Sequence, residues 1–157
     1  ITGWRLGYVL AAEPVMNNIK KIHDFTVVGA ASPLQETALT ALNFGDDYYQ
    51  ELQAHYTLMK EIFTGGLRNL GFKFTEPQGT YFVMMDISEF GYKSDDQFCI
   101  DLAQKVGVAA VPGSSFFREP VNHLIRFHFA RRQEALDEAL KRLQKLAELL
   151  PGKSTSC

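Results

Sequence analysis

Arg5 is the first residue in the chain whose type and surroundings could do chemistry, because it is a cation in an apolar stretch. Trp4 precedes it, Leu6 follows it, and the apolar run continues to Ala11. An arginine is rarely buried without a partner, and its planar guanidinium fits a phosphate or a carboxylate. Gly3 would let a ligand or another backbone come close. The alternative is an edge strand whose arginine lies in water, and the residues alone favour neither.

A second cation, Arg126, lies in the middle of a strand pattern that runs from Leu124 to Phe129. The alternation of side chains along a strand places Arg126 and His128 on one face and the apolar residues on the other. An arginine in such a place needs an anion. From the residues alone, a structural salt bridge is favoured over a ligand. We expect His128 to be a half-exposed histidine with no clear role.

Composition limits the remaining classes of function. The 157 residues are 46% hydrophobic and 22% charged, and the formal net charge is −2, which gives no sign of a nucleic-acid surface. No apolar run is long enough to span a membrane, and the first residues lack the features of a signal peptide. The two cysteines, Cys99 and Cys157, have no metal-ligand spacing and suit a reducing compartment, so we expect a cytoplasmic protein. Cys99 is expected to be a small buried hydrophobe.

Helical spacing and capping residues predict five helices. We expect the first four to begin at Glu13, Ser32, Asp46 and Ser94. Ser32 and Ser94 would be N-cap residues, and Gln35 would reach back to the start of its helix as in a capping box. The last helix carries an apolar stripe from Leu136 to Leu150. The helix from Asp46 to Leu70 is the longest, and Gly65 and Gly66 inside it either allow close packing or weaken it.

Five short apolar segments between these helices predict strands: Leu6 to Ala11, Phe72 to Phe74, Thr80 to Ile87, Val108 to Val111 and Leu124 to Phe129. We expect the first to be buried and the third to be covered on both faces. Strands that alternate with helices predict an α/β or α+β sandwich of a sheet and helices.

The segment from Thr2 to Tyr8, Thr-Gly-Trp-Arg-Leu-Gly-Tyr, resembles the segment just after the Schiff-base lysine of class I aminotransferases, the pyridoxal-phosphate enzymes of fold type I. The family pattern is roughly S-K-T-[FY]-S-x-T-G-W-[RK]-x-G-[YW], and Ile1 occupies the variable position directly before the second threonine of this pattern. The segment Leu124 to Ala130 resembles the family's C-terminal strand. The resemblance covers nearly the whole chain, is closest to the methionine and kynurenine aminotransferase-like branch, and spans less than half of the family's length.

The resemblance implies pyridoxal 5'-phosphate as cofactor, with Arg5 on its phosphate and Arg126 on the α-carboxylate of an amino acid. Val28 and Gly29 match a segment that reaches the partner subunit's active site in a homodimer, and Tyr81 matches a position near the substrate side chain. Phe82, the next residue, is expected to belong to the core. The loop from Pro112 to Phe116 resembles one that moves with the small domain, although a plain turn is the alternative.

The activity that the resemblance implies is transfer of an amino group from an amino acid with an uncharged side chain to a 2-oxo acid. The lysine that would form the Schiff base lies before Ile1 in this pattern. We therefore expect no catalytic residue within the chain, and an isolated chain without activity. Two alternatives are a carbon–sulfur lyase or synthase on the same fold and a non-catalytic interaction module.

The resemblance also predicts a division into domains. Residues 1–28 would end the large cofactor-binding domain, residues 29–70 would form connecting helices, residues 71–151 would form the small domain, and residues 152–157 would be a tail.

Overall fold

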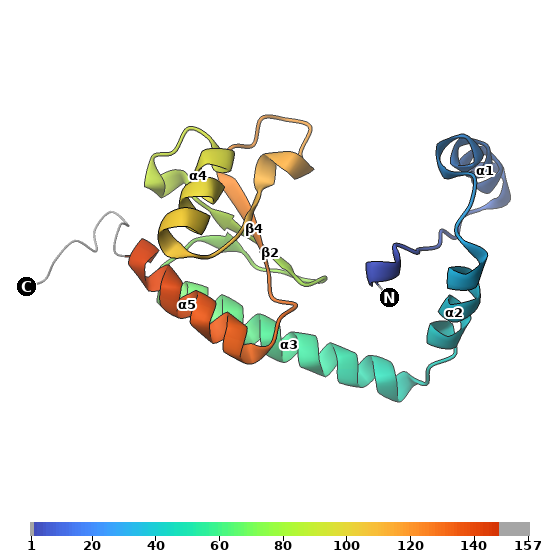
Figure 1. The fold of residues 1–157 in the computed structure, drawn as a ribbon, viewed down its shortest axis with the longest axis horizontal. Helices are drawn as coiled ribbons and strands as arrows, with labels where there is room; N and C mark the ends of the chain where they lie inside the picture. Colours follow the sequence, from blue (N-terminus) through green and yellow to red (C-terminus); the bar gives the residue numbers. More distant parts are fainter. Residues whose placement is uncertain (1, 148–157) are drawn as a thin grey trace, which may run out of the picture. The chain divides into compact units, whose positions relative to one another are not determined.

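The computed structural model describes residues 2–147, and the chain divides into two compact units. The first unit is Ile1–Gln50, and the second begins at Glu51, inside the long helix α3 (Asp46–Asn69). Figure 1 shows α1 and α2 in the first unit and the sheet with α4 and α5 in the second. The expected domain boundaries after residues 28 and 70 stay predictions.

The first unit is helical and has no buried residue between positions 3 and 50. It contains a 3-10 turn, η1 (Thr2–Trp4), then α1 (Glu13–Val27) and α2 (Ser32–Leu42). The start of α1 at Glu13 agrees with the sequence prediction. The predicted buried strand from Leu6 to Ala11 is wrong, because these residues form no regular secondary structure and Leu10 is 86% exposed. A strand needs a neighbour to satisfy its backbone groups, which alternation alone does not supply.

The start of α2 differs by one residue from the predicted capping box. Ala31 is the N-cap residue and no side chain caps it, while Ser32 is already helical. Gln35 does reach back, but its Nε2 donates to the carbonyl oxygen of Ala30 at 2.7 Å. Pro33 fixes the backbone of the first turn, which sets the helix start without a side-chain cap.

Helix α3 presents one apolar stripe to the core of the second unit. Met59, Phe63 and Leu67 are buried on it, as the spacing predicts. Close packing explains one of the two adjacent glycines, because a Cβ on Gly66 would lie 2.4 Å from Leu140 Cδ1. A Cβ on Gly65 would meet nothing within 4 Å.

The second unit is built on a four-stranded antiparallel sheet in the order β1-β2-β4-β3. The strands are β1 (Phe74–Thr75), β2 (Phe82–Asp86), β3 (Val111–Pro112) and β4 (Leu124–His128). The register places Met84 opposite Arg126 and Phe82 opposite His128. Because β4 is central, it is held on both edges, and its side chains have fixed neighbours.

One face of this sheet is buried and the other is only half-buried. Val83 and Met85 on β2 and Ile125 and Phe127 on β4 face the core, with exposures of 4% or less. The alternation predicted for β4 is therefore confirmed. The prediction that residues 80–87 are covered on both faces is wrong, since β2 alternates between half-buried and buried residues.

Three helices contribute to the core on the buried face: α3, α4 (Asp95–Asp101), which continues as a π-helical turn (Leu102–Val106), and α5 (Gln133–Ala147). Ser94 caps α4 as predicted, its Oγ accepting from the N–H of Gln97 at 3.4 Å. Gly107 follows the turn with φ 77°, as expected for a glycine after a helix end. Leu150, predicted to be on the apolar stripe of the last helix, lies outside the described residues. None of the described helices is long and apolar enough to cross a bilayer.

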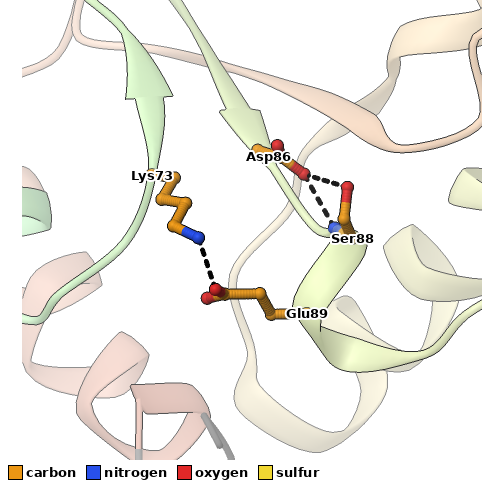
Figure 2. Close-up of polar contacts among 4 residues, drawn as sticks. All are labelled: Lys73, Asp86, Ser88 and Glu89. Atoms are coloured by element: carbon orange, nitrogen blue, oxygen red, sulfur yellow. Dashed lines mark hydrogen bonds and ion pairs between the residues drawn. The ribbon is translucent and has the colours of Figure 1, made fainter.

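A polar cluster lies at the C-terminal end of β2, at Asp86 (Figure 2). Asp86 accepts from the N–H and the hydroxyl of Ser88 at 2.8 and 2.5 Å, and Lys73 Nζ pairs with Glu89 Oε1 at 2.5 Å. Burial alone would raise the pKa of Asp86, but the hydrogen bonds from Ser88 outweigh it and lower that pKa. The cluster holds the 3-10 turn η2 (Ser88–Phe90) against the sheet.

Candidate functional site

Arg126 lies between two aromatic rings on the half-buried face of the sheet. Its Cζ is 4.1 Å from the centre of the Phe82 ring and 3.8 Å from the centre of the Phe116 ring. Phe82 reaches it from β2, diagonally across the strand pair, and Phe116 reaches it from the 3-10 turn η4 (Gly113–Phe116). Ring faces attract a cation and limit the rotamers of a long side chain.

No described carboxylate lies within ion-pair distance of Arg126. The four ion pairs found in residues 2–147 all involve other cations: Arg68, Lys73, Lys105 and Arg142. The structural salt bridge that the residues alone favoured is therefore not present in the described part of the chain. The rings cover the faces of a guanidinium, whereas a carboxylate approaches its edge, so both can bind together.

The turn that carries Phe116 is packed tightly against β4. A Cβ on Gly113 would lie 2.4 Å from the carbonyl oxygen of Leu124, so only glycine fits there. The N–H of Ser114, the next residue, donates to Oδ2 of Asp95 at 2.7 Å. These two contacts fix the turn to β4 and to the start of α4.

The expectation that Phe82 belongs to the core is wrong, because Phe82 is half-buried on the face that carries Arg126. Its neighbour Tyr81 packs instead against the core, with its ring 6.2 Å from that of Tyr56 and 4.3 Å from that of Phe82. Thr80 before them has a positive φ of 62°, which is rare for a β-branched residue. Phe82 therefore contacts Arg126 directly, whereas the ring of Tyr81 contacts the ring of Phe82.

His128 follows Arg126 on the same strand face. Partial burial, Arg131 and Arg126 together lower its pKa below the usual 6.5 of histidine. Burial and the two arginines therefore favour the neutral form of the imidazole.

In the first unit, Arg5 follows η1 and has a positive φ of 56°. Its side chain is exposed, and a Cβ placed on either Gly3 or Gly7 would meet nothing within 4 Å. The backbone on either side of Arg5 is therefore open enough to let a ligand approach. A guanidinium supplies donors of the kind that bind a phosphate, so the residue type suits the phosphate end of the expected cofactor.

Val28 and Gly29 form a strained turn directly after α1. Val28 has φ 62° and ψ −55°, and the N–H of Gly29 donates to the carbonyl oxygen of Val27 at 2.6 Å. This is the rarer and more strained kind of γ-turn, and it is centred on a β-branched residue. Within the first unit, Gly29 lines a cavity of about 660 Å³ together with Gly7 and Tyr8. The segment after Arg5 and the turn after α1 therefore share one cavity.

Comparison with known proteins identifies the family. The model of aminotransferase class I and II matches residues 1–143. The chain belongs to this family. Among curated relatives, the chain is 31% identical to a probable N-succinyldiaminopimelate aminotransferase of Mycobacterium tuberculosis, over 94% of this chain and 40% of that protein. It is 33% identical to the methionine aminotransferase of Escherichia coli, over 93% of this chain and 38% of the relative.

Solved aminotransferase structures share the fold. A structure from Staphylococcus aureus superimposes with a TM-score of 0.81 at 29% identity, over 95% of this chain and 39% of that one. The M. tuberculosis structure gives 0.79 at 32% identity, over 92% and 38%. This confirms the expected fold class, part of a fold type I aminotransferase. Class I aminotransferase relatives use pyridoxal phosphate. The chain spans about 40% of the length of the curated relatives that it matches.

Proposed function

We propose that the whole protein is a pyridoxal-phosphate-dependent aminotransferase that moves an amino group from an amino acid to a 2-oxo acid. The observation that carries this proposal is Arg126, which is half-buried between two rings and has no carboxylate partner in residues 2–147. In a chain of this family, the missing anion is best supplied by the substrate. When bound, the cofactor supplies the electron sink for negative charge at the α-carbon of the substrate.

Arg126 would bind the α-carboxylate of the substrate in a bidentate pair. Such a pair fixes one end of a small molecule in position and orientation, which the removal of a proton from the α-carbon requires. The rings of Phe82 and Phe116 keep the guanidinium in one plane. The edge of that plane is then ready for the carboxylate before the substrate arrives.

The other site residues have roles that rest on their matches to the family. Arg5 would hold the phosphate of the cofactor, since Arg5 is exposed and Gly3 and Gly7 leave the backbone beside it open. Val28 and Gly29 would line the substrate pocket of the partner subunit, and their strained turn supports a role beyond connection. Tyr81 would lie near the substrate side chain, next to Phe82.

The substrate side chain would be uncharged. Phe82 and Phe116 place apolar rings directly on the cation that binds the carboxylate, and these rings would contact the atoms next to the α-carbon. A second carboxylate in that position would lose its hydration without gaining a partner. We therefore expect methionine or phenylalanine to be better donors than aspartate.

The test is product analysis with the whole protein and added pyridoxal phosphate. Methionine and a 2-oxo acid acceptor are expected to give the 2-oxo acid of methionine and the new amino acid in equal amounts. Release of ammonia and a thiol without a new amino acid would refute transfer and indicate a carbon–sulfur lyase. Equal rates with aspartate and methionine would refute the preferred side chain.

We also propose that the whole protein is a cytoplasmic homodimer. The apolar residues exposed on the first unit support an interface, with Phe25 at 93% and Val28 at 81%. The sparing use of cysteine supports a reducing compartment. Sedimentation of the whole protein should give twice the mass of one chain, and a monomer would contradict the proposal.

A further inference from the structure

Asp95 is a buried acid that neither the capping of α4 nor an ion pair explains. Its side chain is 1% exposed, although acids are almost never fully buried unless paired. Ser94 already caps α4. None of the ion pairs among the described residues includes Asp95. Its carboxyl group is therefore retained in the core at a cost in hydration, which calls for a specific partner.

The partner is the turn that carries Phe116. Oδ2 of Asp95 accepts from the N–H of Ser114 at 2.7 Å, while Oδ1 accepts from the N–H of Asp96 at 3.2 Å. Asp95 and Ser114 are 19 positions apart in the chain, so this bond joins the start of α4 to η4. Phe116 lies two residues farther along the same short turn and contacts Arg126 at 3.8 Å.

We propose that Asp95 is a positioning residue for the carboxylate site: its hydrogen bond to Ser114 holds Phe116 against Arg126 and thereby orients the guanidinium. This inference rests on the proposed function for its ligand, but Asp95 and Ser114 themselves do not touch the substrate. Gly113 limits the turn on its other side, against the carbonyl oxygen of Leu124. Loss of the bond to Asp95 would leave the turn held on that side alone.

Asp95→Asn is the direct test, because it keeps the volume and replaces one of the two acceptors with a donor. Asp96→Asn is the matched control, since Asp96 is exposed on the same helical turn and carries the same charge. The control also removes one negative charge from the start of α4, but it leaves the hydrogen bond between Asp95 and Ser114 in place.

The probe is 3-phenylpropanoate, compared with 3-phenylpropanol, which has the same size but no carboxylate. Binding of each to the cofactor-loaded whole protein is measured by calorimetry. Asp95→Asn is expected to weaken the acid about tenfold and leave the alcohol unchanged, because a small misplacement of an orienting group can cost up to ~10²-fold. Asp96→Asn is expected to change neither.

Hydrogen exchange of the peptide that contains Ser114 provides the structural readout. Faster exchange in Asp95→Asn with unchanged binding of the acid would overturn the positioning role. Equal weakening of the acid and the alcohol would also overturn it, since that is the result of general damage to the fold.

Phe116→Leu keeps the proposal testable if Asp95→Asn does not fold, because it removes the ring and leaves the bond to Ser114 intact. It should weaken the acid by a similar factor relative to the alcohol, which keeps the same apolar contacts. Unchanged binding, or equal weakening of the acid and the alcohol, would overturn the proposal. Because binding is measured without turnover, failure of the whole protein to transfer an amino group would refute the proposed function and leave this result standing.

Discussion

Gly65 and Gly66 are neighbours in α3 that the structure distinguishes sharply, and alanine at each position should have different effects. A Cβ on Gly65 would meet nothing within 4 Å, so Gly65→Ala should gain the helix propensity of alanine, about 1 kcal/mol. A Cβ on Gly66 would lie 2.4 Å from Cδ1 and 2.5 Å from Cδ2 of Leu140. Carbon atoms pack at about 3.5–4.0 Å, so the Leu140 side chain would have to move by more than ~1 Å.

Overpacking of this kind typically costs about 1–3 kcal/mol, which offsets or exceeds the gain in propensity. We therefore expect Gly66→Ala to be less stable than Gly65→Ala by about 1–3 kcal/mol. Leu140 is half-buried on α5, so part of the strain can be relieved by its rotation. For the same reason, Leu140→Ala should cost less in the Gly66→Ala background than alone.

Urea unfolding followed by far-ultraviolet circular dichroism measures this difference, with hydrogen exchange in α3 and α5 as the local readout. Fluorescence is unsuitable, because the single tryptophan, Trp4, lies in the first unit. The reasoning is refuted if Gly66→Ala stabilises the protein as much as Gly65→Ala does.

Two further predictions concern Cys99 in the core and His128 on β4. Burial raises the pKa of the Cys99 thiol to about 11, so iodoacetamide should label Cys99 slowly in the native protein and rapidly in urea. The labelling is measured by mass spectrometry in a Cys157→Ser variant. Rapid labelling of the native protein would count against the burial of Cys99. The pKa of His128 lies below 6.5, mainly through burial and then through Arg131 and Arg126. The unfolded chain therefore binds a proton first, so His128 should lower stability as the pH falls below about 6.5. His128→Gln should reduce that loss in urea titrations at several pH values, and an unchanged pH dependence would contradict the assignment.

The local signals in the sequence predicted the helices well. Proline at the start of α1, the Ser94 cap and the positive φ of Gly107 involve contacts within a few residues, so they are visible in the sequence. The missing strand at residues 6–11 shows the limit of this approach. Whether an apolar segment becomes a strand depends on a partner that the segment itself does not specify.

The site shows the same division between local and long-range information. Alternation placed Arg126 correctly on the face opposite the core, because that pattern is local. The two rings that contact it were missed: Phe82 was assigned to the core, and Phe116 was noted only as part of a turn. Their positions depend on the β2–β4 register and on the Asp95–Ser114 bond, both of which join residues far apart in the chain.

The most direct test of the account is the dependence of Arg126 on the carboxylate of the substrate. Arg126→Gln in the whole protein should lower kcat/KM for methionine by about 10²-fold, since loss of one partner of a desolvated charge pair costs ~2–5 kcal/mol. The same substitution should have little effect on kcat/KM for the amine that corresponds to methionine without its carboxylate. Arg68→Gln is the control, because Arg68 also lies over a ring, that of Phe74 at 5.5 Å, but pairs with Glu76 on the surface. Equal losses with both substrates, or no loss with methionine, would contradict the account.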